Sequence, residues 1–132
     1  MPLSRHLFFM TDITNRTDLE FLLATFYNRL LQDPRISYIF THVAKIDLAS
    51  HLPHIVDFWQ QSLFNVGSYR TNVLQVHLDI NDKEKLTSEH FEIWLNHFNN
   101  TVDELFQGDN AEKAKTRALS IATVMQIKLQ KE

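Results

Sequence analysis

The seven histidines are the residues of this chain with the most chemistry to offer. His51 with His54, and His90 with His97, are spaced so that each pair shares a helix face. No Glu-x-x-His pair accompanies them, which excludes a di-iron site of the four-helix type. There is no HExxH motif for a zinc hydrolase, and the absence of cysteine excludes thiolate metal sites and cysteine nucleophiles. For His54, His90 and His97 we therefore expect ordinary helix-surface roles.

His77 differs from these histidines because it lies in an irregular stretch, between the apolar residues Val76 and Leu78. A flat apolar cofactor needs one axial nitrogen ligand, aromatic walls and a few polar groups on the opposite face. Aromatic residues that could form such walls are Phe26, Tyr27, Phe58, Trp59 and Trp94. Taken singly, each of them is more often plain core, so the residues alone leave haem as one candidate among several.

The helices that would position these side chains follow from the spacing of apolar residues. The spacing predicts four substantial helices and a short one, over residues 17–32, 34–40, 47–66, 87–108 and 109–132. From Ser68 to Leu86 the pattern breaks down, and a long irregular stretch in a compact domain is often functional. His77 falls in that stretch.

Helix starts are marked by residues whose side chains accept a hydrogen bond from the first turn. Thr17 begins a capping-box pattern with Glu20, and Asp109 precedes an acid three residues later. Asp47 and Thr87 (or Ser88) are the N-caps expected for the two helices between them.

The composition bounds the class of protein. A length of 132 residues fits one domain, and two glycines are too few for the turns of an all-β fold. A net charge of −3 gives no reason to expect nucleic acid as a partner. No apolar run is long enough to span a membrane or to serve as a signal peptide, so we expect a cytoplasmic, all-α protein.

Short segments in a fixed order resemble the truncated haemoglobin family, and group III most of all. The match runs from Asp12 to Met125, and it rests on the combined order and spacing of its pieces. The matching segments are Phe26-Tyr27, Asp33-Pro34, Ile39-Phe40, His51-Leu52, Asp57-Phe58-Trp59, Tyr69, His77, His90-Phe91, Trp94-Leu95 and Thr101-Val102-Asp103.

The resemblance implies a truncated globin fold, in which two helices stack on two around a haem. The whole chain, 1–132, would be a single domain, with 1–11 as an N-terminal extension. His77 matches the proximal ligand of the haem iron, and His51 matches the residue at the distal gate. The cofactor implied is haem b.

Further site residues follow from the same resemblance. Tyr27 and Trp94 match the residues that reach the bound ligand, as donors of an O–H and an N–H. Arg70 is near enough to His77 in the sequence to pair with a haem propionate. The apolar walls implied are Phe26, Ile55, Phe58 and Phe91.

Two donors would hold oxygen too firmly for easy delivery. We therefore expect detoxification, redox chemistry or scavenging of O2, NO, CO, cyanide or peroxide, rather than oxygen transport. An enzymatic version, such as nitric oxide dioxygenation or peroxide reduction, would need an external reductase, and no residue is assigned as catalytic. The alternative from another class is a cofactor-free helical interaction module whose aromatic residues are plain core.

Overall fold

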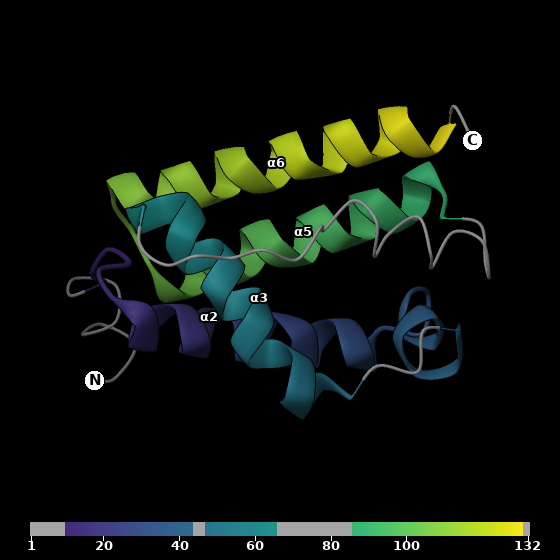
Figure 1. Ribbon diagram of the computed structural model, residues 1–132, viewed down its shortest axis with the longest axis horizontal. Helices are drawn as coiled ribbons and strands as arrows, with labels where there is room; N and C mark the ends of the chain where they lie inside the picture. The colour runs from purple at the N-terminus through teal and green to yellow at the C-terminus, as the bar shows by residue number, and fades with distance from the viewer. Residues whose placement is uncertain (1–9, 44–46, 66–85, 131–132) are drawn as a thin grey trace.

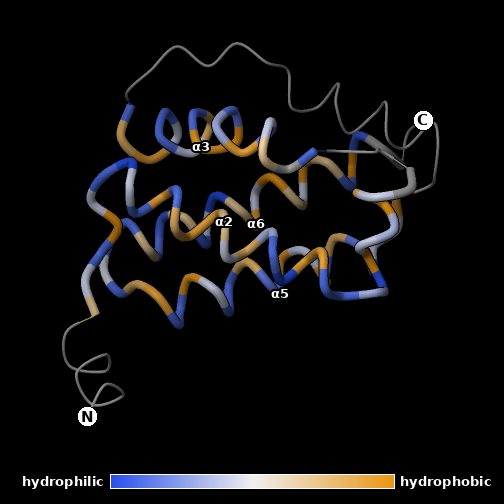
Figure 2. Tube along the Cα trace, turned by 90° about the horizontal axis from the view of Figure 1, so that it is seen from below, coloured by the Kyte–Doolittle hydropathy of each residue, from blue (hydrophilic) through white to orange (hydrophobic). Residues whose placement is uncertain are grey.

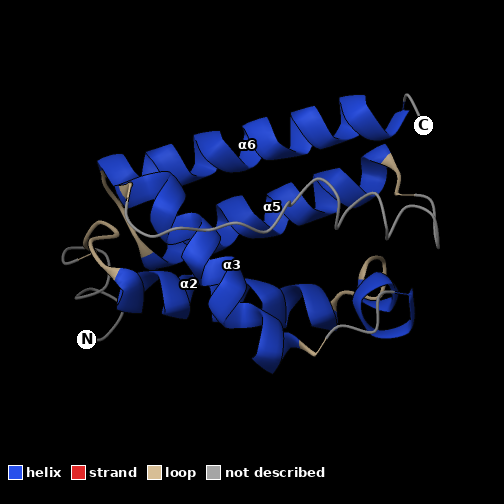
Figure 3. Cartoon of the chain, in the orientation of Figure 1, coloured by secondary structure: helices blue, strands red, loops and turns tan. Residues whose placement is uncertain are grey.

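The computed structural model describes residues 10–43, 47–65 and 86–130, and within these ranges it is helical with no strand (Figure 3). The predicted all-α class is confirmed. The elements in chain order are α2 (Arg16–Gln32), η1 (Ile39–Val43), α3 (Leu48–Phe64), α5 (Ser88–Leu105) and α6 (Asp109–Gln130). His77 and Arg70 lie outside the described residues.

The four long helices pack as two pairs. Helices α5 and α6 are joined by a short connection and run side by side in opposite directions, while α3 crosses α2 (Figure 1). The pairs meet where α2 packs against α5 and where α3 touches α6. The expected stacking of two helices on two is confirmed.

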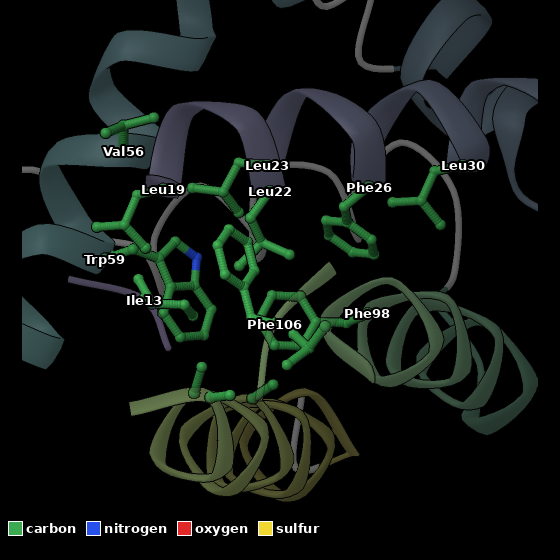
Figure 4. Close-up of a cluster of buried hydrophobic side chains, with 14 of the residues drawn as sticks. Ile13, Leu19, Leu22, Leu23, Phe26, Leu30, Val56, Trp59, Phe98 and Phe106 are labelled. Carbon is green, nitrogen blue, oxygen red and sulfur yellow. The ribbon is translucent and has the colours of Figure 1, made fainter. Parts of the chain in front are cut away.

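The core between the pairs is rich in aromatic side chains (Figure 4). Phe98 of α5 is fully buried and stacks on Trp59 of α3, with ring centroids 5.0 Å apart. Its other neighbours are Trp94, at 5.9 Å, and Phe26 of α2, which meets it edge-on at 5.2 Å. Such pairs stabilise a fold by about 0.5–1.5 kcal/mol beyond their buried area. Phe98 thus links three helices.

Polar and apolar residues alternate along the helices (Figure 2), as the sequence pattern requires. On α6 the small side chains Ala111, Ala114 and Ala118 are buried, so this helix approaches its neighbours closely. Leu119 and Ile127, by contrast, are exposed to solvent.

The N-cap of α2 lies two residues earlier than the sequence pattern predicts. Asn15 is its N-cap, with a side chain that accepts from the backbone N–H of Asp18. The Asp18 carboxylate in turn accepts from the backbone N–H of Thr14 at 2.9 Å. The prediction of Thr17 as the cap was wrong, because Asn15 is the residue whose side chain accepts from the first turn, and Asp18 bonds back to Thr14 in place of a reciprocal bond to the cap.

The N-terminus of α6 is capped by a residue other than the one predicted. The Asp12 carboxylate accepts from the backbone N–H groups of Asn110 and Ala111, both at 2.8 Å. Asp109 was expected in this role, but it is the first residue of the helix itself. Gly108, between α5 and α6, has φ +149°, and a Cβ there would lie 2.5 Å from the Asp12 side chain. Asp12 therefore packs directly against Gly108, where no side chain would fit.

The other two helix starts are confirmed. Asp47 caps α3 and Thr87 caps α5, each through its side chain. The ends come slightly earlier than predicted: α3 ends at Phe64, where Asn65 adopts the left-handed conformation usual at helix ends, and α5 ends at Leu105.

Candidate functional site

An apolar pocket lies between the segment after α2, the first half of α5 and the last half of α6. It spans about 520 Å³, counting the part that is open to solvent. Its first wall is Ile36, Ile39 and Phe40, its second is Leu86, His90, Phe91 and Trp94, and its third is Ile121, Ala122 and Met125. Pockets that bind small molecules are mostly apolar with a few polar groups, and this one has that composition.

A series of aromatic rings runs from this pocket into the core. Phe40 in the pocket wall meets Tyr27 edge-on at 6.1 Å, and Tyr27 lies 4.7 Å from Phe26. Phe26 in turn meets Trp94 edge-on at 5.7 Å. Tyr27 and Trp94, predicted as ligand donors, therefore stand on either side of one buried ring. Helices α2 and α5 place both half-buried side chains toward the same part of the molecule.

His90 is the one titratable side chain among the residues that line the pocket within the described part of the chain. Its Nε2 lies 2.9 Å from the Tyr38 hydroxyl, and its Nδ1 accepts from the backbone N–H of Thr87 at 3.1 Å. The second bond arises because His90 is the third residue of α5, where it completes a capping box with Thr87. His90 is thus held from both ring nitrogens.

Beside the pocket, an ion cluster ties the end of α2 to α5. The Asp33 carboxylate accepts from the Arg35 guanidinium at 2.7 Å and from His97 Nε2 at 2.8 Å. These two hydrogen bonds, with that from Arg35 the stronger influence, hold the pKa of Asp33 well below its usual range. Reciprocally, Asp33 raises the pKa of Arg35. The cluster fixes the start of the segment that carries Ile36, Ile39 and Phe40.

The predicted site residues are distributed unevenly around this pocket. Phe91 and Trp94 line it, and Tyr27 contacts its wall residue Phe40. Phe26 lies in the core behind Trp94, with 1% of its surface exposed.

The predicted residues of α3 are not brought to the described pocket. His51 lies exposed in the first turn of α3. Ile55 and Phe58 are half-buried and pack against the core. His77 and Arg70 fall outside the described residues. The roles predicted for them, and for the three residues of α3, therefore stay predictions.

Tyr38 is the residue that sequence reasoning missed. It lies just before η1, half-buried, with its ring 5.9 Å from the imidazole of His90. The sequence does indicate a structural role for His90, because it lies three residues after Thr87, the position of the second residue of a capping box. Nothing local indicates Tyr38, because the two residues are 52 positions apart.

In ranges 10–43, 47–65 and 86–130, no three His, Asp or Glu side chains gather as a metal site would require. Over the same ranges, no helix is long and apolar enough to cross a membrane.

The arrangement of the helices defines the class of protein. With a TM-score of 0.79 and 26% identity, the chain matches the crystal structure of a group III truncated haemoglobin from Campylobacter jejuni, covering 91% of this chain and 94% of that one. The fold is therefore that of a truncated globin, as predicted.

The sequence comparison points to the same protein type. The chain is 27% identical over 123 residues to the group 3 truncated haemoglobin of Campylobacter jejuni, which covers 91% of this chain and 94% of the relative. No protein-family model matches the chain. The resemblance to group III truncated haemoglobins recognised in the sequence is confirmed by a homologue and by a structure.

Proposed function

We propose that this chain binds haem and, through it, small diatomic ligands. The observation that carries the proposal is the apolar pocket with Phe91 and Trp94 in its wall and Tyr27 beside it. Flat aromatic and aliphatic walls suit the faces of a porphyrin, and the side of the pocket near His90 is polar, where its charged edge would lie. Since the chain has no cysteine, thioether attachment is excluded, which favours non-covalent haem b.

The chain's own residues would share the work as the resemblance implies. His77 would ligate the iron through one ring nitrogen, and Arg70 would pair with a propionate. The bound haem would supply an iron centre that takes up diatomic ligands and exchanges electrons. His51, Ile55 and Phe58 on α3, together with Phe26, would close the ligand side.

Tyr27 and Trp94 decide what kind of haem protein this would be. A phenol O–H and an indole N–H are both donors, and a hydrogen bond to a charged group contributes about 1.5–3 kcal/mol. Two such donors slow ligand release. We therefore infer scavenging, detoxification or redox chemistry of O2, NO, CO, cyanide or peroxide in the cytoplasm, with an external reductase, rather than oxygen transport.

Absorption spectra test the proposal. The purified protein with added haem should give a strong Soret band and distinct ferric, ferrous and carbon monoxide spectra. His77→Ala should abolish the stable ferrous form, whereas His54→Ala, at an exposed position on α3, should change nothing. A protein that takes up no haem would instead favour the cofactor-free interaction module.

A further inference from the structure

We propose that Tyr38 and His90 form a carboxylate-binding site beside the pocket, in which His90 positions Tyr38 and the Tyr38 hydroxyl is the donor. The site would receive a carboxylate carried by an otherwise apolar ligand. On the function proposed above, on which this inference rests, that carboxylate is a propionate of the haem.

The tautomer of His90 follows from its hydrogen bond with Thr87. Its Nδ1 accepts a hydrogen bond from the backbone N–H of Thr87. Because a backbone N–H can only donate, Nδ1 carries no proton in this arrangement. A neutral imidazole with a bare Nδ1 has its proton on Nε2. The capping box of α5 therefore selects one of the two tautomers.

The tautomer sets the direction of the next hydrogen bond. His90 Nε2 lies 2.9 Å from the Tyr38 oxygen and carries the proton, so the imidazole donates and the phenol oxygen accepts. The hydroxyl hydrogen of Tyr38 is then not used by His90. Within the described part of the chain Tyr38 has no other hydrogen-bond partner, so this hydrogen is available to an acceptor.

The surroundings specify what the acceptor would be. Apart from His90 and the indole of Trp94, the side chains that line the described pocket are apolar, with the thioether of Met125 among them. A ligand with a wide apolar body would contact Phe91, Trp94 and Met125, and its polar end would be stabilised only near the His90 side. A phenol that already accepts from an imidazole is polarised toward donation, which favours an anionic oxygen.

The tautomer can be measured before any ligand is added. Nitrogen-15 NMR of the imidazoles at neutral pH should show His90 with its proton on Nε2. A proton on Nδ1 would overturn the proposal, because the hydroxyl of Tyr38 would then have to donate to His90.

The binding test compares haem with iron protoporphyrin IX dimethyl ester, whose carboxylates are blocked. The protein should bind haem about 10–100-fold more tightly than the ester, the range expected for a hydrogen bond to a charged group. Tyr38→Phe should reduce the ratio of the haem affinity to the ester affinity at least tenfold. A preference that Tyr38→Phe leaves intact would overturn the carboxylate site.

A second variant separates the role of His90 from its role in the helix. His90→Gln keeps a side chain that can complete the capping box, but removes the ring N–H that occupies the Tyr38 oxygen. It should reduce the preference for haem over the ester while leaving the helix content and urea stability near those of Glu92→Gln, its control at an exposed position on the same helix. Equal preferences in these two variants would contradict the positioning role.

The outcomes for haem and for the ester separate the proposed function from the carboxylate site. If the unmodified protein binds neither haem nor the ester, both the proposed function and this site are overturned. If it binds haem and the ester equally well, only the carboxylate site is overturned.

Discussion

At the residue scale, the proposed function makes Tyr27 and Trp94 the hydrogen-bond donors to a ligand on the haem. Tyr27→Phe removes one hydroxyl and leaves the ring contacts with Phe26 and Phe40 in place. In the haem-loaded protein we expect oxygen to dissociate about 10–100-fold faster, the effect of losing one hydrogen bond to a charged ligand. Stopped-flow displacement of oxygen by carbon monoxide measures this rate.

The control removes the same atom elsewhere. Thr17→Val deletes an exposed hydroxyl at the start of α2, outside the pocket lining, so it should leave the oxygen dissociation rate close to that of the unmodified protein. An equal rate in the Tyr27→Phe variant and the unmodified protein would remove Tyr27 as a ligand donor.

The contribution of Asp33 to the free energy of unfolding depends on pH. Its pKa is lowered in the folded state, so its contribution to stability is complete above the unfolded carboxyl pKa of about 3.9 and is lost as the pH falls toward the folded value. Asp33→Asn should therefore lower the free energy of unfolding by about 1–2 kcal/mol at pH 7. The difference should shrink below about pH 4.

Urea unfolding of Asp33→Asn and the unmodified protein at pH 7, 5 and 3.5 measures this difference. Asp103→Asn is the matched control, because Asp103 is exposed and pairs with Lys115 at the surface. It should cost less than about 1 kcal/mol. A difference for Asp33→Asn that stayed constant down to pH 3.5 would contradict its low pKa.

At the scale of elements, the start of α6 is held by a residue from another part of the chain. Asp12→Ala removes the acceptor for two backbone N–H groups of α6 and should cost about 1–2 kcal/mol. Asp109→Ala removes only an acid from the first turn and should cost about 0.3–1 kcal/mol. Thermal unfolding of the two variants decides between them: if Asp109→Ala were the more destabilising, Asp109 would be the cap after all.

These helix starts show why some of the fold is readable in the sequence. Asp47 and Thr87 were predicted because each caps the residues directly after it. Asp12 was not, since it lies 98 positions from Asn110 and becomes a cap only after the chain has folded. The error at Thr17 has another cause: two overlapping patterns compete there, and Asn15 with Asp18 forms the one observed.

In the candidate site, too, some residues could be predicted from the sequence and others could not. Phe91 and Trp94 were expected as site residues because they match positions of group III truncated haemoglobins, and both line the pocket. The pairing of Tyr38 with His90 depends on how the segment after α2 packs against α5, which no local pattern records.

At the scale of the whole molecule, one buried ring joins the helix pairs. Phe98 belongs to α5, yet its ring contacts are Trp59 on α3, Phe26 on α2 and Trp94 on α5 itself. The same residues connect the general core to the pocket, because Trp94 belongs to both. Removal of the Phe98 ring should therefore lower the stability of the fold and disturb the pocket wall at the same time.

Phe98→Ala tests this connection, with Phe21→Ala as its control. Phe98 is 0% exposed and Phe21 is 56% exposed, so the same atoms are removed from the core and from the surface of α2. Phe98→Ala should lower the free energy of unfolding by about 3–5 kcal/mol, which is a large part of the 5–15 kcal/mol typical of a domain. Phe21→Ala should change it by no more than about 0.5 kcal/mol.

Urea unfolding followed by circular dichroism and by tryptophan fluorescence measures both variants, and Trp59 and Trp94 both stack on the deleted ring. If the helix pairs form one cooperative unit, the two signals should change at the same urea concentration in every variant. The Phe98→Ala variant should also bind haem more weakly than Phe21→Ala does, because Trp94 loses the ring that holds it in the pocket wall. Equal stabilities for the two variants, or two separate transitions in Phe98→Ala, would show that the pairs are stabilised independently of this ring.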